Sequence, residues 1–275
     1  MSDAGTTPLL SVRDLKVAYP IRSSFLQRKI GENVAVDGVT FDIRPGETVG
    51  LVGESGSGKS TVARAVIGLV RADAGTIEFE GQDITRFSPR QLTAVRREMQ
   101  MVFQDPYASL NPRLTVRDVI AEAWRVHRDV VPRDRWTAEV KELMDRVGLN
   151  PDYSDRYPHQ FSGGQRQRIG IARALALRPK LIICDEPVSA LDVSVQAQVL
   201  NLLDDLQDDL GLAYLFISHD LSVVEHLCDR VLVLHHGVVA EEGTAREVFD
   251  HPRDDYTRAL LAAVPVARPW LEPTS

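Results

Sequence analysis

The feature that most constrains this chain is a glycine-rich string that follows a short apolar run. Residues 53–61 fit the pattern G-x-x-x-x-G-K-[ST], in which glycines let backbone N–H groups converge on phosphate oxygens without Cβ clashes. Residues 48–52 predict a strand, and residues 59–69 predict a helix whose N-terminus favours anions. A chance glycine-rich turn would lack this context, so we expect a phosphate-binding loop in an α/β fold. The loop residues are Gly53, Glu54, Ser55, Gly56, Ser57, Gly58, Lys59, Ser60 and Thr61.

Polar side chains in the loop and after a later strand indicate nucleotide chemistry. Lys59 is expected to bridge the β- and γ-phosphates of a nucleotide, and the Ser60 hydroxyl is expected to ligate Mg²⁺. Residues 181–186 carry two carboxylates to the C-terminal end of an apolar strand, the edge at which α/β sheets bind ligands. There Asp185 can hold Mg²⁺, directly or through water, and Glu186 can polarise a water in line with the γ-phosphate. If this pair of carboxylates is considered without the phosphate-binding loop, a solvated acidic turn that caps a helix would also explain it.

Composition narrows the class of protein. The chain has 275 residues, 44% hydrophobic and 26% charged, which fits one large or two unequal globular domains and excludes a disordered or collagen-like chain. A net charge of −7 gives no dominant basic footprint, so nucleic acid is not an expected partner. No segment reaches the ~18 apolar residues of a membrane span, and the first residues lack a signal-peptide pattern. We therefore expect any membrane association to come through a partner.

The N-terminal part mixes extended patterns with turns. Residues 10–19 predict a strand, residues 21–33 a basic irregular insert, and residues 34–43 a hairpin that turns at Asp37–Gly38. Residues 76–79 predict a further strand, so this part reads as an α/β core with antiparallel strands attached. The basic side chains of the insert are expected to form a solvated face; they are Arg22, Arg28 and Lys29.

The rest of the chain divides into a helical part and a strand-rich part. Residues 90–179 hold helical patterns at 116–127 and 135–147 and few strand signals, which indicates a helical subdomain inserted into the core. Compact apolar runs then return, as is typical of parallel strands covered on both faces. They are residues 181–184, 213–217 and 231–234, with a crossover helix predicted at 193–206 and a helical appendage at 246–264. The two cysteines, Cys184 and Cys228, are far apart, and we expect buried, reduced thiols rather than a disulfide scaffold or a zinc site.

Further strings resemble the motifs of ATP-binding cassette (ABC) ATPases. Residues 161–167 (FSGGQRQ) are similar to the signature motif, although Phe161 stands where the family usually has Leu. Residues 218–220 (SHD) follow a strand and resemble the segment with the family's switch histidine, and residues 102–106 (VFQDP) resemble the Q-loop. Residues 189–192 (SALD) are similar to the D-loop. The resemblance covers about residues 10–265, with the motifs in the family's order and spacing.

The resemblance implies a fold and a division of the chain. It implies the ABC ATPase form of the P-loop NTPase fold: a RecA-like mixed sheet, an antiparallel β-subdomain and an inserted α-helical signature subdomain. The core would comprise about residues 10–89 and 180–244, with the helical subdomain at about 90–179. Residues 245–275 would form a short C-terminal extension.

The resemblance also assigns roles around ATP and Mg²⁺. Glu186, His219, Gln104 and Lys59 would be catalytic, with His219 sensing the γ-phosphate and Gln104 contacting Mg²⁺ or the water. Tyr19 would stack on adenine. The signature residues Ser162, Gly163, Gly164 and Gln165 would bind the ATP held by a second subunit, in a head-to-tail dimer.

Plainer interpretations of three of these features stay open at this point. Ser162 with its two glycines would also suit a helix-capping turn, and His219 would suit a capping or buried histidine. Tyr19 would suit an aromatic residue at the end of a strand.

Within the family, the chain resembles the oligopeptide/dipeptide (peptide/nickel) importer branch. The strings that carry this resemblance are residues 53–58, 105–112 (DPYASLNP), 188–198 (VSALDVSVQAQ) and 255–261 (DYTRALL), the last followed by Pro265. Some subunits of this branch hold an iron–sulfur cluster on C-terminal cysteines. No cysteine follows Cys228, so the chain resembles the subunit type without the cluster.

The resemblance implies an ATP-hydrolysing, nucleotide-binding subunit that energises a membrane importer for di- or oligopeptides. The expected partners are a second ATPase subunit, identical or paralogous, two transmembrane permease subunits and, indirectly, an extracytoplasmic solute-binding protein. The chain would lie at the cytoplasmic face of the cell membrane, held there by the permease. Residues 105–112 would line the groove for a coupling helix of the permease, although a simple surface loop also fits them.

Two other classes of protein are weighed against this function. Non-transport ABC ATPases that act on nucleic acid or the ribosome usually carry two cassettes, coiled coils or zinc modules, and this sequence has one signature motif. A regulatory binder without turnover is disfavoured by the catalytic residues named above. The transported solute, the identity of the paired ATPase, the relative activity of the two composite sites and the role of residues 21–33 stay open.

Overall fold

Two β-sheets organise the chain, for which a computed structural model describes residues 7–22 and 29–263. The antiparallel sheet has the strand order β2-β1-β4-β5. Its strands are β1 (Leu10–Arg22), β2 (Lys29–Ile43), β4 (Ala74–Phe79) and β5 (Gln82–Asp83). The second sheet has the order β10-β9-β3-β8-β7-β6, parallel except for β10, and is therefore mixed. Its strands are β3 (Thr48–Val52), β6 (Met99–Val102), β7 (Leu181–Asp185), β8 (Ala213–Ile217), β9 (Arg230–His235) and β10 (Val238–Thr244).

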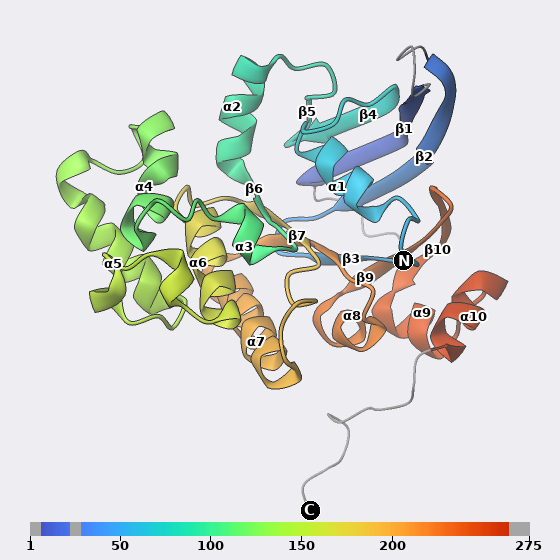
Figure 1. Ribbon diagram of the computed structural model, residues 1–275. Coiled ribbons are helices and arrows are strands. Elements are labelled where there is room, and N and C mark those ends of the chain that lie inside the picture. Colours follow the sequence, from blue (N-terminus) through green and yellow to red (C-terminus); the bar gives the residue numbers. More distant parts are fainter. Residues whose placement is uncertain (1–6, 23–28, 264–275) are drawn as a thin grey trace, which may run out of the picture.

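Helices cover the mixed sheet, and a group of them lies to one side of it. They are α1 (Lys59–Val66), α2 (Pro89–Glu98), α3 (Pro106–Ser109), α4 (Val116–Val126), α5 (Trp136–Arg146), α6 (Gly163–Leu175), α7 (Val193–Leu210), α8 (Leu221–Leu227), α9 (Ala245–Asp250) and α10 (Asp255–Ala262). Short 3₁₀ turns lie at Arg133–Arg135, Pro151–Tyr153 and Pro158–Gln160. Figure 1 shows α4, α5 and α6 gathered on one side of the molecule, and α9 and α10 beside β10.

Both faces of the mixed sheet are buried, which explains the apolar runs in the sequence. Tyr214 and Phe216 of β8 point into the core shared with α4–α8, whereas Leu215 and Ile217 point into the core shared with α1 and the antiparallel sheet. Full burial of such a side chain contributes about 1.5–3 kcal/mol. The strands expected at 48–52, 181–184, 213–217 and 231–234 are confirmed, as is the mixed α/β fold class.

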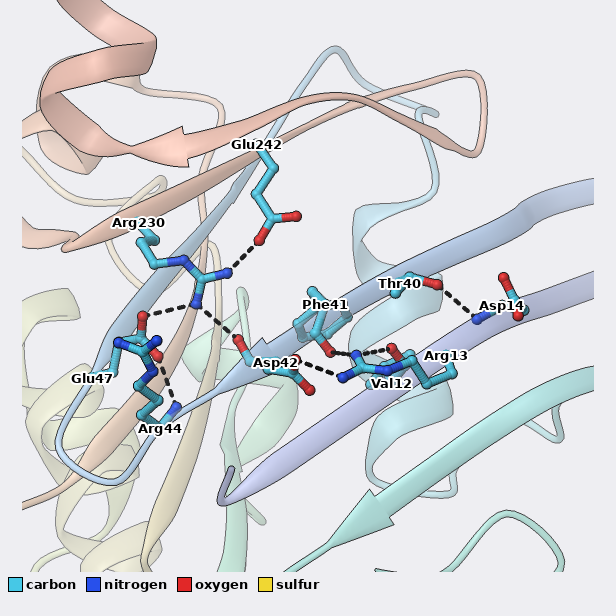
Figure 2. Close-up of polar contacts among 10 residues, drawn as sticks. All are labelled: Val12, Arg13, Asp14, Thr40, Phe41, Asp42, Arg44, Glu47, Arg230 and Glu242. Atoms are coloured by element: carbon cyan, nitrogen blue, oxygen red, sulfur yellow. Dashed lines mark hydrogen bonds and ion pairs between the residues drawn. The ribbon is translucent and has the colours of Figure 1, made fainter. Parts of the chain in front are cut away.

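An ion-pair cluster joins the two sheets at one corner (Figure 2). Arg230 of β9 pairs with Glu47 at 2.9 Å and with Glu242 of β10, and it donates to the backbone oxygen of Asp42 in β2 at 3.2 Å. Arg13 of β1 pairs with the Asp42 carboxylate at 2.6 Å. The chain that leads into β3 is therefore tied to both sheets just before the glycine-rich loop.

The hairpin expected at residues 34–43 is wrong. These residues form one strand, β2, and Gly38 is the extra residue of a bulge, because Leu15 pairs with Val39 and the next residue, Lys16, pairs with Asp37. Gly38 has φ +76°, a conformation that glycine adopts at little cost, so the Asp–Gly pair bends the strand and does not reverse it. The partner of β2 is β1, and residues 23–28 between them lie outside the described residues.

Two further segments, the insert expected at residues 21–33 and the helical part expected at residues 90–179, also differ from their predictions in the structure. The ends of the range 21–33 are strand, since Ile21 and Arg22 continue β1 and residues 29–33 begin β2. The range 90–179, expected to be a helical subdomain with few strand signals, also contains strand β6, which pairs in parallel with β7 inside the mixed sheet. Helices expected at 116–127, 135–147 and 193–206 are present as α4, α5 and α7. The division into subdomains stays a prediction.

Two further expectations concern the cysteines and the membrane. Cys184 and Cys228 are both free and buried, and burial raises the pKa of each thiol. Over residues 7–22 and 29–263, no helix has the length and apolar character needed to cross a membrane.

Candidate functional site

The glycine-rich loop joins β3 to α1 and fits between two other strands. Gly53 has φ +143°, and a Cβ atom there would lie 2.1 Å from the backbone oxygen of Leu234. Gly58 has φ +107°, and a Cβ atom there would lie 2.3 Å from the backbone oxygen of Ala35. Both positions therefore require glycine, and the loop is held in a fixed shape before any ligand binds.

The Lys59 ammonium lies across the inside of this loop. Its side chain is 5% exposed, and Nζ donates to the backbone oxygens of Gly53 at 2.7 Å and Glu54 at 2.8 Å, with Ser57 Oγ at 3.4 Å. Burial lowers the pKa of Lys59, although the nearby charge of Glu186 opposes that shift. A phosphate group bound in the loop would place further negative charge beside this buried cation.

Ser60 and Asp185 meet at the base of the loop. The Ser60 hydroxyl donates to Asp185 Oδ1 at 2.9 Å, and Asp185 is only 3% exposed. Burial raises the pKa of the Asp185 carboxyl, while the hydrogen bond from Ser60 and the charges of Arg64 and Lys59 lower it. A hydroxyl beside a carboxylate fits Mg²⁺, which takes a few protein oxygens and completes its shell with water and substrate phosphates. Among the described residues, no cluster of three His, Cys, Asp or Glu side chains forms a metal centre by itself.

Asp185→Asn should make the ligand-free protein more stable and less active. Because burial raises the folded-state pKa, ionised Asp185 costs stability at neutral pH, and an amide of the same shape removes that cost. We expect the Tm without nucleotide to rise by about 2–4 °C, the change that ~1 kcal/mol gives in a chain of this size. The gain should be absent in acid below the unfolded-state pKa, where the wild-type carboxyl is protonated in both states.

Thermal unfolding followed without nucleotide, at neutral pH and in acid, measures this effect, with phosphate release as the activity readout. Asp205→Asn on the exposed side of α7 is the matched control, and we expect its Tm to equal that of the wild type. A clear drop in Tm for Asp185→Asn at neutral pH would contradict the argument.

Three polar side chains converge where β6, β7 and β8 end at one edge of the mixed sheet. Glu186 follows β7, and its Oε2 accepts from Gln104 Nε2 at 2.8 Å and lies 3.2 Å from His219 Nδ1. Gln104 comes two residues after β6, and His219 comes two residues after β8. The Glu186 backbone has φ +49°, a conformation that non-glycine residues rarely adopt and that concentrates at functional sites.

The loop and this cluster line one open cavity of about 600 Å³. Its lining includes Gly58, Lys59, Ser60, Gln104, Glu186 and His219 together with Ser55, Gly56, Thr61, Tyr19, Asn33 and Ala35. Tyr19 is 38% exposed, and its hydroxyl lies 3.4 Å from Thr61 Oγ1. Asn33 and Ala35 were missed by the sequence analysis. They reach the cavity through the pairing of β1 with β2, in which Asn33 lies opposite Tyr19.

The signature residues begin α6 in a different place. Ser162 and Gln165 form a capping box, in which Ser162 Oγ accepts from Gln165 N at 3.3 Å and Gln165 Oε1 accepts from Ser162 N at 3.0 Å. Gly164 packs against α7 so closely that a Cβ atom would lie 2.3 Å from Val195 Cγ1. In the part of the chain that the structure describes, residues 162–165 do not line the cavity. The start of α6 therefore lies outside the chain's own cavity, with the Ser162 side chain exposed.

Comparisons with known proteins agree on one family. The ABC transporter family matches residues 36–189. The oligopeptide transport ATP-binding protein AppF of Bacillus subtilis (strain 168) is 55% identical over 269 residues, which are 98% of this chain and 82% of that protein. The glutathione import ATP-binding protein GsiA of Escherichia coli (strain K12) is 57% identical over 262 residues, 95% of this chain but only 42% of that protein.

Two solved structures of ABC proteins are also similar to this chain. The cbiO1 protein of Clostridium perfringens, described as part of the ABC transporter complex cbiONQ, has a TM-score of 0.75 and 29% identity and covers 89% of this chain and 91% of its own. A dimeric ATP-binding cassette in a post-hydrolysis state, bound to ADP and Pi, has a TM-score of 0.75 and 27% identity. It covers 86% of this chain and 99% of its own.

Proposed function

The chain belongs to the ABC transporter family as a subunit that binds and hydrolyses ATP to energise import, and from this premise we propose that its cargo is a di- or oligopeptide. The cavity with Lys59, Glu186 and His219 is the observation that carries the ATPase chemistry. The 55% identity to an oligopeptide transport subunit over 98% of the chain supports the cargo. The chain spans only 42% of the glutathione import protein, so that protein's cargo gives weaker support.

In this proposal the chain's own residues position the γ-phosphate and a water. Lys59 exchanges its backbone partners for phosphate oxygens, and the loop's N–H groups bind the remaining phosphate charge. Glu186 accepts a proton from the attacking water, while Gln104 and His219 fix the position of its carboxylate. Tyr19 stacks on the adenine.

Ser60 and Asp185 are the residues that would hold Mg²⁺, with Gln104 at the edge of that site. The ion, when bound, neutralises phosphate charge in the transition state. The Ser60 hydroxyl must then turn its proton away from Asp185, because a hydroxyl ligates a cation through its oxygen.

The active site in this proposal is completed by a second ATPase subunit. The start of α6 offers backbone N–H donors and the Ser162 hydroxyl, yet these groups lie outside the chain's own cavity. A head-to-tail partner would bring its own signature residues to this chain's ATP and receive this chain's Ser162 in return. The dimeric relative bound to ADP and Pi supports this arrangement.

We assign the permease contact to residues 105–112, whose first two residues also end the Q-loop segment 102–106. Asp105 caps α3 through the N–H groups of Tyr107 and Ala108, and the Tyr107 ring is 65% exposed beneath the Arg166 guanidinium. Arg173 of α6 donates to the backbone oxygen of Ser109 at 2.6 Å. A displacement of residues 105–112 would therefore be transmitted to α6, which begins with the signature residues. The chain would in this way lie at the cytoplasmic face of the membrane.

The proposal is tested by purifying the tagged chain from detergent-solubilised membranes of its source cells. We expect two permease subunits and an ATPase partner to co-purify, and the ATPase rate of the complex to rise when a peptide-loaded binding protein is added. Tyr107→Ala should reduce permease recovery and leave ATP affinity unchanged. A chain that is recovered without permease, and whose ATPase rate rises with nucleic acid or ribosomes, would instead be a non-transport ABC ATPase.

A further inference from the structure

The last helix in the described part of the chain reaches the glycine-rich loop. The hydroxyl oxygen of Tyr256 in α10 accepts the backbone N–H of Glu54 at 3.2 Å. The Tyr256 ring stacks on His235 at the end of β9, with the ring centroids 3.7 Å apart and an angle of 11° between the planes. The residues that ATPase chemistry requires do not include Tyr256 or His235, so this contact needs its own explanation.

One peptide group connects Tyr256 to Lys59. The N–H of the peptide between Gly53 and Glu54 faces the tyrosine hydroxyl. The carbonyl of that same peptide, Gly53 O, is the nearest acceptor of the Lys59 ammonium, at 2.7 Å. Because a peptide group is planar and rigid, holding its N–H also fixes the direction of its carbonyl. The Tyr256 hydroxyl and the Lys59 ammonium are therefore connected through one rigid peptide group.

The position of Tyr256 is itself well determined. The Glu241 carboxylate on β10 accepts the backbone N–H groups of Arg253 at 2.9 Å and Asp254 at 3.1 Å. Asp254 then caps α10 by accepting the N–H of Tyr256 at 2.8 Å. These contacts attach the start of α10 to the mixed sheet, which also carries the loop. The Tyr256 hydroxyl is thus held in place by the attachment of α10 and by the stacking of its ring on His235.

We propose that Tyr256 is a positioning residue for ATP binding, which holds the Gly53–Glu54 peptide so that Lys59 lies ready for the incoming phosphates. Without the hydroxyl the Glu54 N–H turns to water, the peptide gains freedom, and ATP must order it on binding. The effect belongs to the binding step, since Tyr256 does not line the cavity where the water attacks. The inference rests on the assignment of that cavity to ATP.

The test compares Tyr256→Phe with the wild-type full-length chain. The phenyl ring keeps the stack on His235 and loses only the hydroxyl. We expect the Kd for ATP, measured by titration calorimetry, to rise about three- to ten-fold, the range that one net hydrogen bond gives. We expect kcat at saturating ATP and the Tm without nucleotide to stay at wild-type values. Tyr256→Ala, which also loses the ring stack, should lower that Tm as well.

Tyr153→Phe is the matched control, since it removes a tyrosine hydroxyl outside the cavity, and its Kd for ATP should equal that of the wild type. If Tyr256→Phe binds ATP with wild-type affinity, or if Tyr153→Phe weakens binding equally, the positioning role is overturned. A wild-type chain that fails to bind ATP at all would instead refute the assignment of the cavity, so the two failures are distinguishable.

Discussion

Replacing Glu186 with Gln will slow ATP hydrolysis by about 10²–10⁴-fold, the usual contribution of a general base, while ATP stays bound. The amide has the size of the carboxylate and can still accept from Gln104 Nε2, which contacts Glu186 at 2.8 Å in the wild type. It has lost the charge that polarises the water and the ability to take its proton. If ATP binding closes a pair of subunits, as proposed above, that pair should therefore persist in Glu186→Gln, because the hydrolysis step that would reopen it is blocked.

Three measurements on purified Glu186→Gln check this result. Phosphate release gives the turnover rate, calorimetry gives the Kd for ATP, and light scattering on a sizing column gives the mass with and without ATP. We expect a low rate and an unchanged or smaller Kd, and, where the paired subunit is a second copy of this chain, a dimer that appears with ATP. Glu225→Gln, which removes the same charge from the exposed side of α8, is the control and should behave as the wild type. Near-normal turnover of Glu186→Gln would show that another group accepts the proton.

The central strands could be predicted because their burial leaves a direct mark on the sequence. A strand covered on both faces is apolar throughout, as β7 and β8 are, and the residue after such a strand lies at the ligand-binding edge. Asp185 and Glu186 were located in this way, whereas His219 was identified through the resemblance to ABC ATPases; the structure brings Glu186 and His219 within 3.2 Å. Their catalytic roles stay predictions.

The errors arose where a distant contact outweighs a local signal. Asp37–Gly38 is a strong turn signal, yet pairing with β1 keeps β2 continuous and Gly38 only forms a bulge. Strand β6 is an edge strand of four residues with Gln100 half-buried, so neither a long apolar run nor a clear alternation marks it. Asn33 and Tyr256 reach the loop through strand pairing and helix docking, which no local pattern of residues reports.

Replacing Lys59 with Ala will weaken ATP binding itself, by about 10- to 150-fold, the range for hydrogen bonds to a charged group. In the empty loop the ammonium satisfies the backbone oxygens of Gly53 and Glu54, and in the filled loop it faces the phosphates. Calorimetric titration with ATP measures the loss. Lys180→Ala is the control: this exposed lysine pairs with Glu80 at 2.7 Å, and surface pairs contribute little. Unchanged ATP affinity in Lys59→Ala would contradict the role of this side chain.

The pH dependence of ATP binding gives an independent check on Lys59. Burial lowers the pKa of the empty-state ammonium, whereas the negative phosphates of bound ATP raise it, so binding takes up a proton between the two pKa values. ATP affinity must then fall as the pH rises through that interval, because the deprotonated lysine has to be charged again on binding. Lys59→Ala lacks the group and should lose this slope, whereas Lys180→Ala should keep it. The same slope in the wild type and in Lys59→Ala would place the proton on another group and leave Lys59 uncoupled from the phosphates.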